Sequence, residues 1–224
     1  MTNEHNVEPA ATAAGPARAA LVDAMGRFHQ HRAHLLNLVS PTPQRPLFGP
    51  AVTIAYLPYR DDTPDTSALG FGGWFYRAVG ETPQDRVLVL SSGGYPNVSH
   101  GGGTKLSRLH NHGLAGVLAD GRLRDFDELA RYSFATWCTG EVTRWGGDTV
   151  TPCAANTAVE VGGVTVIPGD CADRAGAVVI PPASLHDVLA EARRVEDEDR
   201  GFRSQIRDEN PAALRSGKQR SSEL

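Results

Sequence analysis

The residue types best suited to chemistry gather in a short polar turn, Asp120-Gly-Arg-Leu-Arg-Asp125, which follows an apolar run. The guanidinium group of arginine binds a carboxylate or a developing oxyanion through a fork of N–H donors. An aspartate with further oxygen ligands is a typical site for Mg²⁺. Asp120 and Arg124 are therefore candidate catalytic residues and Asp125 is a candidate metal ligand. A charged surface turn is an equally good interpretation of this stretch alone.

A second candidate site is the glycine-rich segment 92–105, which reads Ser-Gly-Gly-Tyr-Pro-Asn-Val-Ser-His-Gly-Gly-Gly-Thr-Lys and opens a predicted helix. Backbone N–H groups at the start of a helix bind anions, and glycine lets a ligand approach the main chain closely. The spacing matches neither the Walker loop nor G-x-G-x-x-G, so it does not support nucleotide binding. A plain flexible loop is the alternative. The residues predicted to bind substrate are Tyr95, Gly102, Gly103, Thr104 and Lys105, together with Arg124.

Two side chains of the glycine-rich segment could take part in proton transfer or covalent chemistry. His100 lies inside the segment, where an imidazole could act as an acid or a base near neutral pH. Lysine is scarce, since the chain has two lysines against twenty arginines. Lys218 lies in a polar tail, so a mechanism through a Schiff base would have one candidate, Lys105.

The elements that must position these residues alternate between apolar runs and helical patterns. Because the two candidate stretches follow consecutive strands, they open on the same edge of the sheet if those strands are neighbours. Strands outnumber long helices, so we predict a β-rich α/β fold with a mixed sheet. The aromatic run 71–76 could line a pocket or an interface, but core packing is the favoured interpretation. We predict strands over 51–57, 87–90, 114–119, 158–161, 164–167 and 177–180, and helices over 19–38, 104–112 and 183–206.

Length and composition indicate an ordinary globular protein. With 224 residues, 40% hydrophobic and 21% charged, the chain can bury a sizeable core. We predict one domain over 18–208, preceded by a flexible arm (1–17) and followed by a polar tail (209–224). The net charge of −4 argues against nucleic acid as a partner. We find no apolar run long enough for a membrane span and no secretory signal, and three cysteines without metal-ligand spacing predict reduced thiols in the cytoplasm.

Several runs of the chain, taken together, resemble one known family. The run Leu114-Ala-Gly-Val-Leu-Ala-Asp-Gly-Arg-Leu-Arg-Asp125 is followed by Gly162-Gly-Val-Thr-Val-Ile-Pro-Gly-Asp170 and by residues 172–181. These runs resemble the RraA-like family, which holds the 4-hydroxy-4-methyl-2-oxoglutarate (4-carboxy-4-hydroxy-2-oxoadipate) aldolases and the protein regulators of ribonuclease E. Residues 21–25, 48–54 and 87–90 are similar to the earlier elements of the family, in the same order.

The resemblance implies a β-rich sandwich of mixed sheet with flanking helices that assembles into a ring, as a trimer or hexamer with active sites between subunits. It also implies that Arg124 holds the pyruvyl group and stabilises its enolate. Asp125 would then bind Mg²⁺ or Mn²⁺, and the backbone amides near Gly103, Thr104 and Lys105 would hold the pyruvate carboxylate. A 2-oxo acid would be the substrate, and no lysine is needed.

The chain departs from the family pattern at Gly103, in the loop that holds Tyr95 and His100, and in the segment 61–75. The family usually has an acidic residue at the start of the helix, holding a water ligand of the metal, where this chain has Gly103. A neighbouring subunit normally contributes a glutamate from its C-terminal helix, and Glu196, Glu198 or Asp199 could fill that role. The segment 61–75 is longer and more aromatic than the family pattern.

These residues lead to one function hypothesis and two alternatives. The first is a divalent-metal-dependent C–C lyase that acts on a 2-oxo acid by retro-aldol cleavage or decarboxylation. The second keeps the pocket but uses the His100 loop for isomerisation, dehydration or cyclisation. The third is a non-catalytic regulator or binding protein.

Overall fold

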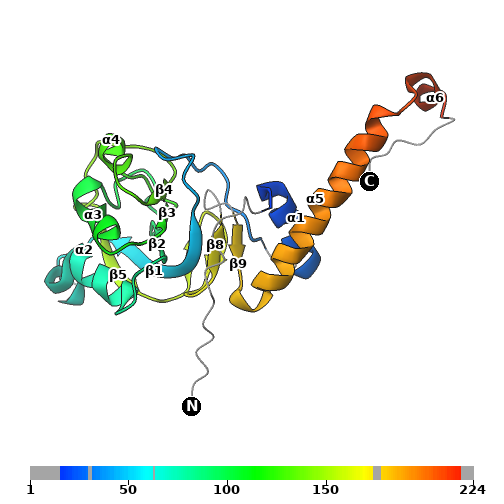
Figure 1. The fold of residues 1–224 in the computed structure, drawn as a ribbon. Coiled ribbons are helices and arrows are strands. Elements are labelled where there is room, and N and C mark those ends of the chain that lie inside the picture. The colour runs from blue at the N-terminus through cyan, green and yellow to red at the C-terminus, as the bar shows by residue number, and fades with distance from the viewer. Residues whose placement is uncertain (1–15, 30–31, 63, 174–177, 218–224) are drawn as a thin grey trace, which may run out of the picture.

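Figure 1 shows the computed structural model, which describes residues 16–29, 32–62, 64–173 and 178–217. Its centre is a mixed sheet with the strand order β4-β3-β2-β1-β8-β9. The parallel part contains β1 (Phe48–Pro58), β2 (Val87–Ser91), β3 (Gly116–Ala119) and β4 (Ala135–Trp137). Consecutive parallel strands lie side by side, so the loops that follow β2 and β3 leave the same edge.

The long strand β1 also pairs with antiparallel strands at its two ends. Its first residues pair with β8 (Cys171–Asp173), which in turn pairs with β9 (Val178–Ile180). Its last residues pair with β5 (Val150–Ala155). A separate hairpin of β6 (Val159–Val161) and β7 (Val164–Val166) turns through Gly162 and Gly163. Both glycines have positive φ, as the tight two-residue hairpin turn requires.

Helices cover the sheet at two places (Figure 1). On one side lie α2 (Pro64–Val79), α3 (Gly103–Asn111) and the short α4 (Phe126–Leu129). Beyond β8 and β9, α1 (Arg18–Phe28) packs against the first half of α5 (Leu185–Arg207), which follows the 3-10 turn η1 (Pro182–Ser184). The rest of α5 runs away from the sheet toward α6 (Pro211–Arg215). No helix among the described residues is long and apolar enough to cross a membrane.

The core follows from the alternation of side chains along the strands. Leu88 and Leu90 of β2 belong to the cluster under α2, α3 and α4. Val87 and Val89 belong to a second cluster, which packs against the β6–β7 hairpin. All four side chains are fully buried, which explains why β2 reads as a continuous apolar run rather than as alternating residues.

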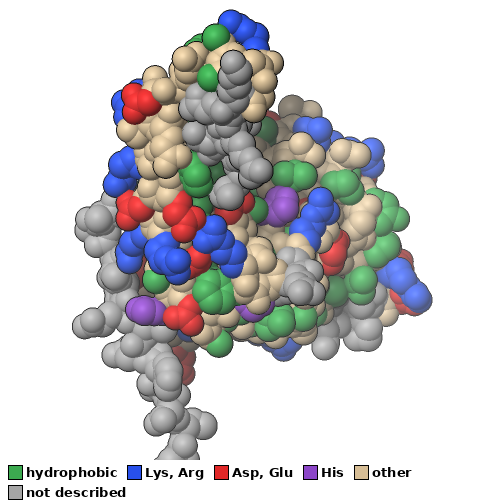
Figure 2. All heavy atoms as spheres, turned by 90° about the vertical axis from the view of Figure 1, so that its right-hand side faces the viewer, with side chains coloured by type: hydrophobic (Ala, Val, Ile, Leu, Met, Phe, Trp, Pro, Cys, Tyr) green, Lys and Arg blue, Asp and Glu red, His purple; other side chains and the backbone are tan. Residues whose placement is uncertain are grey.

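The exposed face of α1 and α5 carries charges of both signs. Figure 2 shows arginine and acidic side chains side by side over this face. Arg27 of α1 pairs with Glu191 and Glu198 of α5, and Arg194 and Arg200 pair with acids one turn earlier on α5. Such exposed pairs contribute little to stability, so the buried side chains Val188, Ala192 and Val195 hold α5 in place.

The mixed sheet with flanking helices, the strands at 51–57 and 87–90 and the hairpin are confirmed. The predicted helix over 19–38 is wrong beyond Phe28, because the backbone turns extended at His29 (φ −130°, ψ 137°). Residues further along form isolated bridges instead, such as Val39 with Cys138. Most of the predicted N-terminal arm, 1–17, and the tail end with Lys218 lie outside the described residues.

The sequence prediction missed the helices α2, α4 and α6 and the strands β4, β5 and β8. Helix α2 contains three glycines, which have low helix propensity, and it is kinked at Gly70 (φ 53°). Its aromatic residues Phe71, Trp74 and Phe75 are buried in the core, as the favoured interpretation of that run held. Tyr76, in contrast, is exposed.

Candidate functional site

The two candidate stretches meet at the edge of the sheet where β2 and β3 end. Because β2 and β3 are neighbours, the glycine-rich segment and the polar turn leave the same edge, as predicted. The Arg124 N–H donates to the Gly101 carbonyl at 2.9 Å, and the His100 N–H donates to the Arg122 carbonyl at 3.1 Å. These backbone bonds fix the start of α3 against the start of α4.

Asp125 is turned back toward the start of α3. Its backbone has φ 63° and ψ 49°, in the left-handed region just before α4. Its Oδ2 accepts a hydrogen bond from the Gly103 N–H at 3.1 Å. A Cβ at Gly102 would lie 2.6 Å from this oxygen. Any residue other than glycine would therefore displace the Asp125 carboxylate. The side chains of Arg124 and Asp125 are 40% and 41% exposed, with Nε and Oδ1 4.0 Å apart, so both can meet a ligand.

A further carboxylate, which sequence reasoning missed, belongs to the same cluster. The Glu128 side chain covers the face of Gly103, where an added Cβ would overlap its carboxylate. The Tyr132 hydroxyl lies 2.7 Å from Glu128 Oε1 and 3.2 Å from the Gly103 carbonyl oxygen. The bond to Glu128 is the main cause of a raised Tyr132 pKa. Glu128 thus occupies the space that a side chain at position 103 would need. The short spacing between Asp125 and Glu128 was the available signal in the sequence.

The donor set of this cluster fits a hard divalent cation. Mg²⁺ and Mn²⁺ prefer carboxylate oxygens and complete their shells with water and substrate oxygens. Asp125 and Glu128 both supply carboxylates next to the Gly102–Gly103 backbone. Within the described ranges no group of three or more His, Cys, Asp or Glu side chains could hold a metal, so most ligands would come from water and substrate.

Asp120 is held by backbone groups and not by the cluster. Its Oδ1 accepts from the Ser92 N–H at 2.6 Å and its Oδ2 from the Gly162 N–H at 3.3 Å. Burial raises its pKa, while the hydrogen bond from Ser92 and that from Gly162 act in the opposite direction. The carboxylate therefore connects the ends of β2 and β3 with the β6–β7 hairpin.

His100 lies inside the protein, with 1% of its surface exposed. Its Nε2 is 3.1 Å from the Ser92 carbonyl oxygen, and its ring meets the Tyr56 ring edge to face at 4.8 Å. The Tyr56 hydroxyl donates to the His100 carbonyl at 2.7 Å, and a Cβ at Gly121 would overlap the imidazole. Nδ1 has no hydrogen-bond partner among the residues that the structure describes. Burial lowers the His100 pKa, so the ring is neutral near pH 7 and donates from Nε2.

The remaining predicted substrate-binding residues lie at two places. Tyr95 is 41% exposed on the loop after β2. Gly103, Thr104 and Lys105 form the first turn of α3, where backbone N–H groups have no partner within the helix. The Lys105 side chain leaves this turn toward a cavity of about 250 Å³ that it shares with residues of β1, α2 and β5.

The acidic residues of α5 differ in how they are engaged. Glu196 accepts from the Ala17 N–H at 2.6 Å, and Glu198 pairs with Arg27 at 3.2 Å. Asp199 lines a hollow between α1 and α5. The structure brings none of the three to the Arg124–Asp125 cluster of the same chain.

Comparisons with known proteins agree with this fold. The family model described as RraA-like: Aldolase/RraA matches residues 18–179. A protein of Halalkalibacterium halodurans named "Putative 4-hydroxy-4-methyl-2-oxoglutarate aldolase" is 28% identical over 62% of this chain and 67% of its own length. Protein DlpA of Legionella pneumophila is 26% identical over 64% of this chain, which spans only 23% of DlpA.

Solved structures give the same picture. RraAS2 of Streptomyces coelicolor, described as an unusual member of the RNase ES inhibitor RraA protein family, superposes with a TM-score of 0.69 and 26% identity. The match covers 83% of this chain and 90% of RraAS2. A protein of Pseudomonas syringae superposes with a TM-score of 0.67 over 87% of this chain and 90% of its own, and at 23% identity it supports the fold alone.

Proposed function

The chain belongs to the RraA-like family, and we propose that it is a divalent-metal-dependent C–C lyase that acts on a 2-oxo acid. One observation carries this proposal. Arg124, Asp125 and Glu128 are gathered around the backbone of Gly102 and Gly103, at the start of α3. A forked cation and the N–H groups of Thr104 and Lys105 are donors that suit a 2-oxo acid and its enolate, and the carboxylates suit a divalent cation.

The chemistry follows from where each group lies. The first-turn N–H groups of α3 bind the carboxylate of the pyruvyl group, and the Arg124 guanidinium donates to the 2-oxo oxygen. In aldol cleavage a base takes the proton from the hydroxyl group on C4, and the C3–C4 bond breaks. Its electron pair forms the pyruvate enolate, while C4 leaves as a carbonyl. Arg124 stabilises the negative charge that develops on the enolate oxygen.

Asp125 is the residue that would hold the divalent cation, which supplies Lewis-acid polarisation of the 2-oxo group when bound. Glu128, beside it, is the base that takes the hydroxyl proton. Its hydrogen bond with Tyr132 orients the carboxylate over Gly103. In decarboxylation the enolate forms as CO₂ leaves, so that reaction needs Arg124 but no base.

The direct test is pyruvate release from 4-hydroxy-4-methyl-2-oxoglutarate and from oxaloacetate. We expect pyruvate with Mg²⁺ or Mn²⁺ and loss of turnover on adding EDTA, with recovery when the cation is restored. If neither substrate yields pyruvate, the result would contradict the lyase proposal and favour either other chemistry or a non-catalytic role. Turnover that persists in EDTA would remove the metal from the proposal and leave Arg124 to be tested alone.

We also propose that the protein works as a homo-oligomer, a trimer or hexamer, in which α5 brings an acid to a neighbour's cluster. The distal half of α5 leaves the body of its own chain (Figure 1), and its Ile206 is 43% exposed. Sedimentation velocity at low micromolar concentration is the measurement. A monomer that retains full lyase activity would contradict a shared site.

A further inference from the structure

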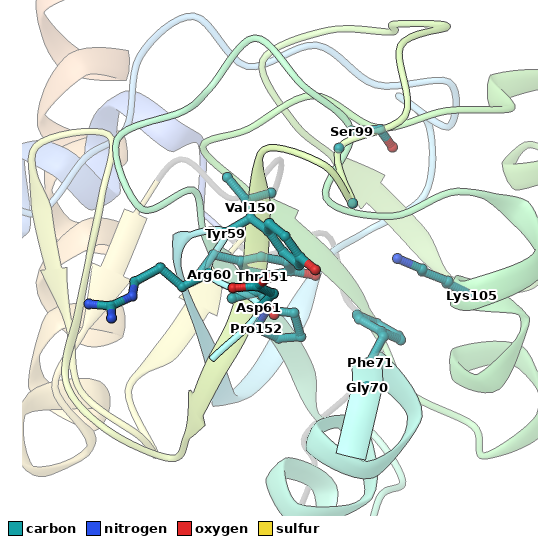
Figure 3. A pocket seen from close by; sticks show the side chains of 13 residues that line it. Tyr59, Arg60, Asp61, Gly70, Phe71, Ser99, Lys105, Val150, Thr151 and Pro152 are labelled. Atoms are coloured by element: carbon teal, nitrogen blue, oxygen red, sulfur yellow. The ribbon is translucent and has the colours of Figure 1, made fainter. Parts of the chain in front are cut away.

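The side chains that line the cavity beside Lys105 have no role in the reaction proposed above. The cavity lies between the end of β1, the start of β5, the kinked part of α2 and the first turn of α3, and it measures about 250 Å³. Figure 3 shows Lys105 pointing into it from α3 and Phe71 from α2. Tyr59, Val150 and Pro152 supply further apolar wall on the opposite side.

Lys105 is the lysine side chain that faces this cavity. Its Nζ lies 5.6 Å from the centre of the Phe71 ring, in a cation–π arrangement. Of the carboxylates in the described part of the chain, none forms an ion pair with it. Burial lowers its pKa, and the nearby cations Arg108 and Arg124 lower it further. A half-buried cation among other cations is a site where an anion is stabilised.

The other charged residues that line the cavity, Arg60 and Asp61, form no ion pair with Lys105. Arg60 pairs with Asp62 at 2.5 Å, and its guanidinium points away from the cavity in Figure 3. Asp61 lies on the exposed loop after β1 and forms no ion pair with Lys105. The cavity therefore combines the Lys105 ammonium with aromatic and aliphatic walls, while the Asp61 carboxylate also belongs to its lining.

We propose that this cavity binds the carboxylate end of a small organic acid with an apolar body, with Lys105 as its ion-pair partner. The carboxylate occupies the space beside the ammonium, and the carbon skeleton packs between Phe71 and Pro152. A volume of about 250 Å³ suits a ligand the size of phenylacetate, below the usual range for drug-sized molecules. The proposal uses the side chain of Lys105 and stands whether or not the lyase reaction does.

The test is binding of phenylacetate to the full chain, measured by titration calorimetry and by saturation-transfer NMR. Phenylacetamide, which has the same shape without the charge, should bind at least tenfold more weakly. Lys105→Met should lose most of the affinity for phenylacetate, while Lys105→Arg should keep part of it. Because the chain has only two lysines, the Lys105 side-chain NMR signal can be assigned by its loss in Lys105→Met. Its pKa should rise when phenylacetate binds.

Two matched variants separate this cavity from other cationic sites. Arg77→Met removes an exposed cation that stacks on Trp74 at 5.0 Å but does not line the cavity, so binding should be unchanged. Arg124→Gln removes one of the cations near Lys105 and should weaken phenylacetate binding much less than Lys105→Met does. Equal binding of acid and amide would overturn the proposal. So would unchanged affinity in a folded Lys105→Met, or a larger loss of affinity in Arg124→Gln than in Lys105→Met.

Discussion

The two parts of the glycine-rich segment both contain glycines but differ in what surrounds their polar groups. In the first part, residues 92–100, the polar residues at the two ends are enclosed: His100 is buried against Tyr56, and the Ser92 N–H donates to Asp120. In the second part, residues 101–105, the groups border the Arg124–Asp125 cluster and the Lys105 cavity. A polar side chain surrounded by fixed backbone partners stabilises the fold. One with an open side can meet a ligand.

The largest expected effect is on catalysis, at the Arg124–Asp125 cluster that borders residues 101–105. Arg124→Lys should lower the kcat of pyruvate release by about 10²–10³-fold, because a point charge cannot replace the fork that faces the enolate oxygen. Arg122→Lys is the matched control in the same turn, since Arg122 donates to the Glu141 carbonyl at 3.0 Å. It should keep kcat within a few-fold. Equal losses in both variants would show that the turn acts only through its fold.

A change at the enclosed residue His100 should alter stability and not catalysis. His100→Ala removes a buried ring and its bond to Ser92, so the free energy of unfolding should fall by about 2–4 kcal/mol. Urea unfolding measures the change. For molecules that remain folded, kcat should stay within a few-fold of the wild type. A loss of kcat by several orders of magnitude with normal stability would make His100 catalytic and break the comparison.

A substitution of Glu128 tests whether the Arg124–Asp125 cluster provides the base for aldol cleavage. At saturating Mn²⁺, Glu128→Gln should slow aldol cleavage by about 10–100-fold and largely spare decarboxylation of oxaloacetate, which requires no base. Titration of Mn²⁺ by electron paramagnetic resonance should show weaker binding. Asp127→Asn makes the same charge change one residue earlier and should affect neither measurement. Equal slowing of both reactions would assign Glu128 to metal binding alone.

A smaller effect is expected in the pH dependence of stability. The lowered His100 pKa means that the unfolded chain binds a proton more readily, from about the ordinary value of 6.5 downward. The free energy of unfolding should therefore fall with falling pH below this value, by up to about 1.4 kcal/mol per pH unit. Asp120, whose pKa is raised, gives the opposite slope above 3.8. The His100 slope should disappear in His100→Ala, and an identical slope there would assign it to another group.

Strands β2 and β3 were predictable because their signal is local, whereas part of the site depends on the fold. The runs in β2 and β3 are apolar throughout, since both faces of these strands are covered. The burial of His100 depends on Tyr56, which lies far away in sequence. The position of Glu128 depends on how α4 leaves the left-handed Asp125. Chemistry-bearing residue types could be identified from the sequence, but their exposure could not.

The central place of β1 has a consequence for how the chain matures during synthesis. Gly49 and its neighbours pair with residues around Ala172, and Pro58 pairs with Val150. Both ends of β1 thus remain without their antiparallel partners until the ribosome has made most of the chain. Unpaired strand edges recruit other strands. The emerging protein should therefore be most prone to aggregate, and most dependent on chaperones, before residue 171 leaves the exit tunnel.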